Sequence, residues 1–343
     1  MSAGYVIAGI LGLALLMVVH EAGHLLAARA FGMRVLRFSI GFGPPLFRYQ
    51  ARGSDTVYQV ALIPFLAYVQ IAGMNPFEEI DENDKSSYAN GSLVARISAI
   101  VAGPLANYLF ASVFFFFAFF IGGRSVPTTT VRIDEGPAKA AKMQDGDTIK
   151  SIDGVAVSEW EDVRRRIVAN PNRQLSLGIE RQGKPLTLKV TPMLKDGEGR
   201  IGVGTIEKQV PMTLREVTIG SLVHPALVVE SLVVTLARII TGKDKPQFTG
   251  PVGIVKETSK AAKRSFSDYL MLLGILSAYL GGFNLLPFPA LDGGRLAFLS
   301  YEAITRRRPN AQVEAKVHFL GLVMLLALIA VVSVFDVVDI RGN

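Results

Sequence analysis

Long stretches without a single charged side chain constrain the fold of this chain more than any other feature. Four of them are about long enough to cross a bilayer: Met1–Val19, Ile97–Ile121, Tyr269–Leu291 and Val317–Phe335, which lies between Lys316 and Asp336. At a rise of about 1.5 Å per residue, helices of these lengths cross most of a hydrocarbon core about 30 Å thick. We therefore expect a polytopic α-helical membrane protein with four transmembrane helices.

The composition agrees with a membrane protein and excludes several other classes. Half of the residues are hydrophobic and the mean hydropathy is +0.36, which rules out a disordered or fibrous chain. The net charge is +7, but the basic residues form no stripe interleaved with aromatics, so we expect no nucleic-acid partner. Cysteine is absent, so any metal must be held by histidine and carboxylate side chains.

The distribution of basic residues predicts the orientation in the membrane. They concentrate between the first two apolar runs and after the third, at Arg29, Arg34, Arg37, Arg48, Arg52, Lys85, Arg96, Arg295, Arg306, Arg307, Arg308 and Lys316. Such segments stay on the cytoplasmic side. Both termini and the long segment Gly122–Asp268 are therefore expected outside, in a bacterial inner membrane.

The first part of that outside segment has the pattern of a small α+β domain, which we place at residues 128–208. Strands are expected at Thr130–Ile133, Thr148–Ile152, Leu175–Glu180 and Leu186–Val190, and a helix at Glu159–Val168. Gln182-Gly183-Lys184 is the expected turn between the last two strands. The domain has membrane parts on either side, at 1–127 and 269–343.

Two further segments are expected at or in the membrane without crossing it. Ser221–Gly242, within the connecting segment 209–268, has one polar face and a broad apolar face, which is typical of an interfacial helix. Val35–Gly73 alternates apolar and polar residues around Gly41-Phe42-Gly43, which predicts a membrane-associated β-hairpin. Such a hairpin needs protein or water to satisfy its backbone.

The pattern His20-Glu21-Ala22-Gly23-His24 carries the chemistry. On a helix, the imidazoles of His20 and His24 share one face and can bind zinc, while Glu21 is placed to act on water at the metal. Charged groups and imidazoles at membrane depth are costly and usually functional. The pattern therefore predicts a catalytic zinc site.

A catalytic zinc needs a third protein ligand, for which Asp292 is the best candidate. This carboxylate closes the third apolar run, and the first and third helices are expected to run in the same direction, so it reaches the depth of His20 and His24. The remaining histidines, His224 and His318, are expected to be interfacial polar residues. A fifth span at 221–242 would carry Asp292 to the opposite face.

Six segments of the chain resemble the site-2 protease family of intramembrane zinc metalloproteases, in particular its branch similar to the bacterial regulator of sigma-E protease. They are HEAGH at 20–24, GFGPPL at 41–46, AGPLAN at 102–107, GPAKAAKMQDGDTIKSIDG at 136–154, TGPVGI at 249–254 and NLLPFPALDGG at 284–294. The resemblance covers nearly the whole chain. It implies that residues 128–208 form a PDZ-like domain, where several relatives have two in tandem.

The resemblance also implies the roles of the site residues. His20, His24 and Asp292 would bind Zn²⁺ and Glu21 would be the general base. Asn284 would lie near the substrate, and we group Pro287, Pro289 and Asn107 with it as candidate substrate-binding residues. Gly103-Pro104 and Asn107 have an equally good reading as helix-packing residues.

We thus expect a protease that hydrolyses a peptide bond within or beside the transmembrane helix of a single-span protein, such as an anti-sigma factor or a signal-peptide remnant. A substrate helix hides its carbonyls in its own hydrogen bonds, so it must unwind, and the predicted hairpin could hold it by strand addition. Two alternatives remain: a non-catalytic scaffold with a peptide-binding domain and structural zinc, and a zinc protease for soluble peptides outside. Glu21 argues against the first, and the inner-face depth of His20 and Asp292 against the second.

Overall fold

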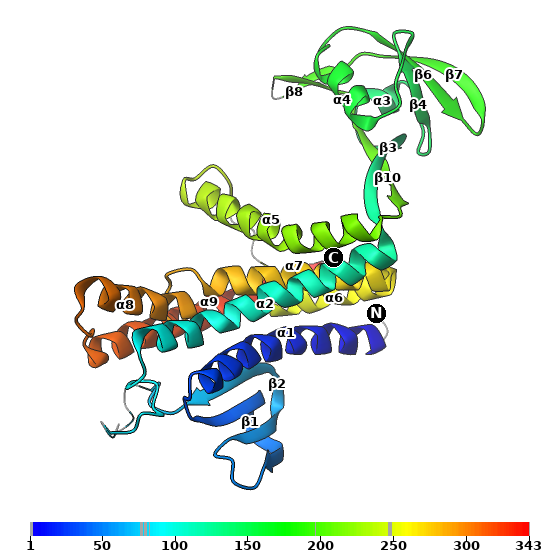
Figure 1. Ribbon diagram of the computed structural model, residues 1–343. Helices are drawn as coiled ribbons and strands as arrows, with labels where there is room; N and C mark the ends of the chain where they lie inside the picture. The colour runs from blue at the N-terminus through cyan, green and yellow to red at the C-terminus, as the bar shows by residue number, and fades with distance from the viewer. Residues whose placement is uncertain are drawn as a thin grey trace. The chain divides into compact units, whose positions relative to one another are not determined.

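The computed structural model describes residues 3–75, 78, 81, 83–195, 197–245 and 249–342 of the chain. Met1 and Ser2, where the first predicted span begins, lie outside the described residues. The chain forms two compact units, one made of Met1–Ile121 with Thr213–Asn343 and the other of Gly122–Met212 (Figure 1). The first unit is mainly helical and contains every candidate metal ligand predicted above.

The helices of the first unit include five that are long and apolar enough to cross a membrane. They are α1 (Ala3–Ala30), α2 (Leu93–Gly122), α5 (Leu214–Ile240), α7 (Phe266–Asn284) and the first part of α9 (Ala311–Gly342). Four of them correspond to the predicted spans, and α5 is the segment predicted to be interfacial. Two shorter helices, α6 (Pro251–Arg264) and α8 (Asp292–Thr305), complete the unit.

The third predicted span is shorter than expected. It was predicted to run to Leu291, but α7 ends at Asn284 and residues 285–291 form a turn before α8. Pro287 and Pro289 explain the difference, because proline lacks the N–H that a helix needs and pushes the residue before it out of helical geometry. Apolar character alone does not distinguish this turn from the helix.

Helices α1, α2 and α7 pack closely through small residues. Gly23 of α1 lies directly against the Ala102 carbonyl of α2, where a Cβ atom would clash. The Ser277 hydroxyl of α7 donates to the Asn107 carbonyl of α2 at 2.8 Å. Helix α7 also contacts α1 directly, since Gly12 of α1 lies against Tyr269 and Leu273 of α7.

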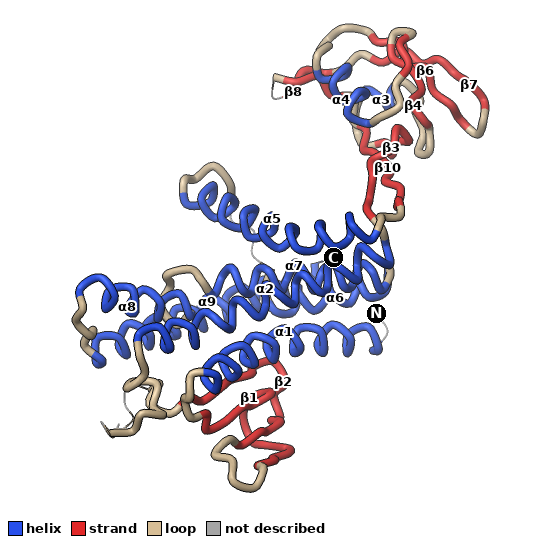
Figure 2. The backbone as a smooth tube through the Cα atoms, viewed as in Figure 1, coloured by secondary structure: helices blue, strands red, loops and turns tan. Residues whose placement is uncertain are grey.

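A twisted two-stranded ribbon, β1 (Val35–Gln50) and β2 (Val57–Ile71), packs against α1 (Figure 2). Residues 35–40 of β1 pair with 57–60 on one side and with 67–71 on the other. Residues 67–71 therefore form an outer edge of the sheet. The predicted hairpin is present, and its edge runs alongside the helix that carries His20 and His24.

The second unit is an α+β fold with its own core. Its strands are β3 (Arg124–Ile133), β4 (Thr148–Ile152), β5 (Val155–Ala156), β6 (Leu175–Arg181), β7 (Lys184–Val190), β8 (Met193–Lys195), β9 (Glu198–Arg200) and β10 (Val203–Val210), and its helices are α3 (Pro137–Ala140) and α4 (Trp160–Val168). The main sheet has the order β10-β3-β4-β6-β7. Its core includes Val131, Ile149, Val163 and Leu177, which are fully buried.

The local signals in this unit behave as predicted. The predicted helix start, Glu159, is the N-cap of α4, which begins one residue later at Trp160. Gln182 and Gly183 both have positive φ and join β6 to β7, as a tight hairpin turn requires. The short strands β8 and β9 were missed because three-residue strands have too little periodicity to detect.

Candidate active site

Three potential metal ligands come together from two distant parts of the chain. The Nε2 atoms of His20 and His24 lie 3.2 Å apart, and Asp292 Oδ2 lies 3.1 Å from the first and 3.3 Å from the second. Both histidines are 5% exposed. The structure therefore places Asp292, at the start of α8, next to the two histidines of α1.

The separations of these atoms fit a zinc ion. Zinc bound by nitrogen and oxygen at about 2.0–2.1 Å in a tetrahedron places its ligand atoms about 3.3–3.4 Å from one another. Three donors at these separations occupy one face of such a tetrahedron and leave a fourth position for water or substrate. Among the described residues, these three are the only group of histidine and carboxylate side chains that could hold a metal.

His24 is oriented by α2. Its Nδ1 donates to the Ala99 carbonyl at 2.7 Å, which leaves Nε2 with the lone pair that a metal needs. Gly103, one turn further along α2, makes room for the ring, because a Cβ atom there would overlap with His24 Nε2. Of the two readings left open for Gly103, the structure thus supports a role in shaping the site.

Asn107 of α2 performs a similar function for His20. Its side chain is fully buried, and its Nδ2 lies 3.3 Å from His20 Nδ1. Within the described structure its Oδ1 has no hydrogen-bond partner. Rotating the amide by 180° would let Oδ1 accept a proton from His20 Nδ1, which is the arrangement that leaves Nε2 free for a metal.

Glu21 lies between the metal-site histidines and the sheet edge. Its Oε2 accepts a hydrogen bond from the backbone N–H of Val69 in β2, at 3.0 Å. Val69 lies in the outer strand 67–71, so this N–H points away from β1 toward the site. The carboxylate therefore adjoins both the metal ligands and a backbone donor that a bound peptide could use.

The turn before Asp292 is tightly built. Gly293 packs directly against the backbone of Leu285 and Leu286, and a Cβ atom would collide with both. Ala290 has a φ of 74°, an unusual conformation for a residue with a side chain. Its N–H donates to His318 Nδ1 at 3.0 Å, so α9 also holds the turn in place.

The other predicted residues lie further from the chemistry. Asn284 donates to the Leu280 carbonyl of its own helix at 2.9 Å, Pro287 is exposed, and Pro289 packs against Gly321 of α9. Among the described residues, no hydrogen bond or ion pair joins these three to His20, His24 or Asp292. His224 stacks edge-on against Phe115 at a centroid distance of 4.6 Å and takes no part in the ligand cluster.

Sequence reasoning missed the groups that act through their backbone. The Ala99 carbonyl and the Val69 N–H carry no signal in the sequence, because every residue type has them. Gly103 was noticed, but only the structure shows that the His24 imidazole fills the space that a side chain at this position would take. A membrane-embedded constellation of two histidines, a carboxylate ligand and an adjacent glutamate defines a metal-dependent hydrolase.

Comparison with known proteins identifies which hydrolase it is. Residues 8–328 match the model of peptidase family M50. The chain is 31% identical to the zinc metalloprotease RasP of Geobacillus kaustophilus, over 93% of this chain and 94% of that protein. It is 30% identical to RasP of Bacillus licheniformis over 97% and 98%, and 28% identical to the regulator of sigma-W protease RasP of Bacillus subtilis over 97% and 98%.

The chain therefore belongs to peptidase family M50, the site-2 protease family. It is an intramembrane zinc metalloprotease, a multi-pass membrane protein that uses Zn²⁺ as its cofactor.

Proposed function

We propose that this protease cleaves single-span membrane proteins within or beside their transmembrane helix, with His20, His24 and Asp292 holding the zinc and Glu21 acting as general base. The observation that supports this most strongly is the position of Glu21, which adjoins two histidine ligands and also accepts the free Val69 N–H of the sheet edge. A peptide lying along that edge passes the ligand cluster.

The roles of the residues follow from their positions. When bound, zinc supplies Lewis acidity that polarises a peptide carbonyl and acidifies water. Glu21 accepts a proton from the attacking water and passes it to the leaving amine. Residues 67–71 hold the unwound substrate as an added strand, since the outward N–H of Val69 needs a carbonyl partner once Glu21 turns to the water.

Four spans, rather than five, agree best with the helix directions. The Tyr269 hydroxyl of α7 donates to the Ala8 carbonyl of α1, and Asp292 meets His20 and His24, so α1 and α7 run the same way. The chain between α2 and α7 must then leave and return on one side. If α5 crossed the membrane, α6 would have to cross back, but its 14 residues span only about 21 Å and carry Lys256 and Lys260.

We further propose that residues 128–208 form one PDZ-like domain on the same side as both termini, outside the cytoplasm. The sheet of the second unit, with its small helices α3 and α4, supports this reading. The name of the Bacillus subtilis relative refers to sigma-W. It supports an anti-sigma factor as the natural substrate, in a regulated proteolysis pathway.

The purified protein in detergent tests the proposal. Incubation with single-span membrane proteins should give cleavage inside or next to the span, and a zinc chelator should abolish it. Glu21→Gln should bind zinc like the parent protein and lose turnover, because the amide keeps the shape and cannot accept a proton. Asp292→Ala should lose zinc as well as activity. Cleavage by Glu21→Gln, or unchanged zinc content in Asp292→Ala, would contradict the assigned roles.

A further inference from the structure

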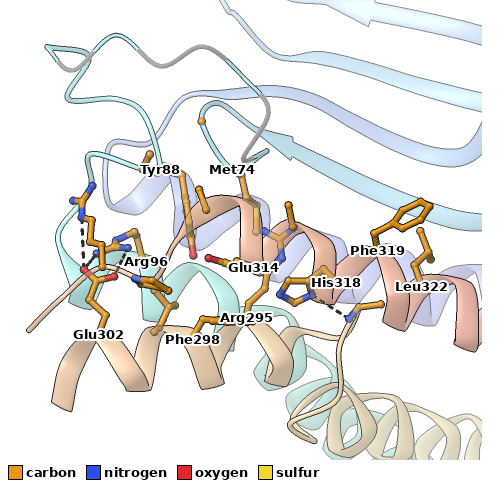
Figure 3. A pocket seen from close by; sticks show the side chains of 18 residues that line it. Met74, Tyr88, Arg96, Arg295, Phe298, Glu302, Glu314, His318, Phe319 and Leu322 are labelled. Atoms are coloured by element: carbon orange, nitrogen blue, oxygen red, sulfur yellow. Dashed lines mark hydrogen bonds and ion pairs between the residues drawn. The ribbon is translucent and has the colours of Figure 1, made fainter. Parts of the chain in front are cut away.

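A cavity of about 440 Å³ lies next to the active site, between α8, α9, the start of α2 and the segment after β2 (Figure 3). Two parts of its lining come from elements of the active site. Gly73 and Met74 follow the outer strand 67–71, and Ala290 precedes Asp292 by two residues. The outer strand 67–71, whose Val69 N–H reaches Glu21, therefore leads toward this cavity.

Two hydrogen-bond donors in the lining have no acceptor among the described residues. His318 accepts the Ala290 N–H at Nδ1, so Nε2 carries the proton of the neutral ring. That Nε2 is buried and finds no partner among the described residues. Arg295 on α8 forms no ion pair or hydrogen bond with any described residue either, and its side chain lies beside His318 in Figure 3.

Of the two acidic residues in the lining, Glu302 is already ion-paired. Glu302 is bound by Arg96, with a 3.0 Å hydrogen bond to Nη1, and Arg308 Nε lies 3.8 Å from it. Glu314 lies next to the Tyr88 hydroxyl in Figure 3. Burial raises the pKa of Tyr88 to about 12, so this hydroxyl remains a donor at neutral pH.

From these observations we propose that the cavity is a specificity subsite that binds an acidic side chain of the substrate through Arg295 and His318. This rests on the proposed function. Val69 adjoins the general base, and the lining begins four residues later at Gly73, which is about 13 Å along an extended strand. The acidic residue therefore lies about four or five residues from the scissile bond. Phe298 and Phe319 also line the cavity, where they would contact the aliphatic carbons of the acidic side chain.

A substrate panel tests this directly. One cleavable transmembrane sequence would carry Asp or Asn at each of the seven positions on either side of the cut, and kcat/KM would be measured for each pair. We expect a preference for Asp of about tenfold at one position, four or five residues from the cut, as a charge-assisted hydrogen bond gives. Arg295→Gln should abolish that preference, and Arg295→Glu should favour Lys at the same position.

Arg307→Gln is the matched control, since it removes the same charge from an exposed turn residue outside the cavity, and it should keep the preference. Cleavage without any dependence on flanking charge, or a dependence that survives Arg295→Gln, would overturn the subsite and leave the proposed function intact. Failure to cleave any membrane substrate would instead refute the proposed function.

Crosslinking gives a second measurement that does not depend on Arg295 variants. A photo-reactive residue is placed in the substrate at the selected position. This substrate is then bound to the inactive Glu21→Gln protein and crosslinked by light. Adducts at Phe298 or Phe319 support the subsite. Exclusive adducts elsewhere, or capture of lipid by a photo-reactive group introduced in place of Phe319, would show that the cavity has another occupant.

Discussion

At the residue scale, the two histidines proposed to bind zinc are oriented in different ways. His24 is held by a backbone carbonyl, which no substitution can remove, whereas His20 depends on the side chain of Asn107. We assign Asn107 as a positioning residue, because a side chain that is fully buried against His20 has no surface left for a substrate.

Substitution of Asn107 should therefore affect metal affinity. We expect Asn107→Leu to weaken zinc binding about 10- to 100-fold, measured by competition with a chelator, because the Nδ1 proton of His20 loses its acceptor. Asn107→Asp should restore most of the affinity, since a carboxylate accepts the same proton. Ser112→Ala, which alters a buried hydroxyl on the same helix, serves as the control. Equal losses in the Leu and Asp variants would indicate a packing role only.

Gly103 gives a second residue-scale prediction. Gly103→Ala should reduce zinc affinity and activity together, because the new methyl group overlaps with the His24 imidazole and must displace it. Gly4→Ala makes the same change in α1 where nothing lies within 4 Å, and it should behave like the parent protein. Zinc titration of both variants in detergent tests this prediction. Normal zinc affinity in Gly103→Ala would show that the His24 ring has room to move.

At the element scale, the proposed four spans predict that α5 does not cross the membrane. The chain has no cysteine, so single cysteines can be introduced without a background. We expect cysteines at Thr213 and Gly242, the two ends of α5, to react with a membrane-impermeant thiol reagent added from the same side of intact cells. Opposite accessibility would mean that α5 spans the bilayer, and the helix directions above would then require α6 to cross as well.

A buried ion pair in the second unit predicts its pH dependence. Asp147 is 1% exposed, and both of its carboxylate oxygens accept from Arg181 at 2.8 Å. The Arg181 guanidinium and the Gln144 N–H hold the pKa of Asp147 below its ordinary value. This pair therefore stabilises the unit above about pH 4, and its contribution is lost as the pH falls through the lowered pKa of the folded state.

Fluorescence can follow that loss, because the only tryptophan, Trp160, packs against the core of this unit. Asp147→Asn should lower the unfolding midpoint of the Trp160 signal by several degrees at pH 7, and the difference from the parent should shrink at acidic pH. Asp134→Asn removes an exposed carboxylate 3.9 Å from Arg132 and should have little effect. A pH-independent difference for Asp147→Asn would contradict the ionic explanation.

At the scale of the whole molecule, the three candidate zinc ligands all belong to the helical unit. The second unit begins and ends on paired strands, with Arg124 opposite Val210, so its ends meet and a short linker can replace it. Deletion of Gly122–Met212 should leave a protein that still binds zinc and cleaves a substrate with a short outside tail. The truncated protein should no longer discriminate against substrates with a bulky outside domain, because the deleted unit is what would exclude them sterically.

Two substrates test this size filter. Both have the same transmembrane sequence, and one carries a short outside tail while the other carries a large folded outside domain. The cleavage rate of each is measured with the full-length and the truncated protein. Equal rates for both substrates in the full-length protein would exclude it. Reduced cleavage of both substrates after deletion would instead indicate that the unit recruits substrates by binding peptide ends.

The class of this protein could be predicted from its residue patterns, and so could the three side chains that the structure brings together in the candidate site. The uncharged runs predicted four of the five apolar helices, and the spacing of His20 and His24 identified the metal chemistry, because both signals are local and periodic. Asp292 was also predictable, since parallel helices place their ends at the same depth. Only the tertiary structure decided what orients these groups: a carbonyl of α2, the space at Gly103 and an N–H of the outer strand. Such contacts arise between elements far apart in the chain and use backbone atoms or a missing side chain, so no residue pattern records them.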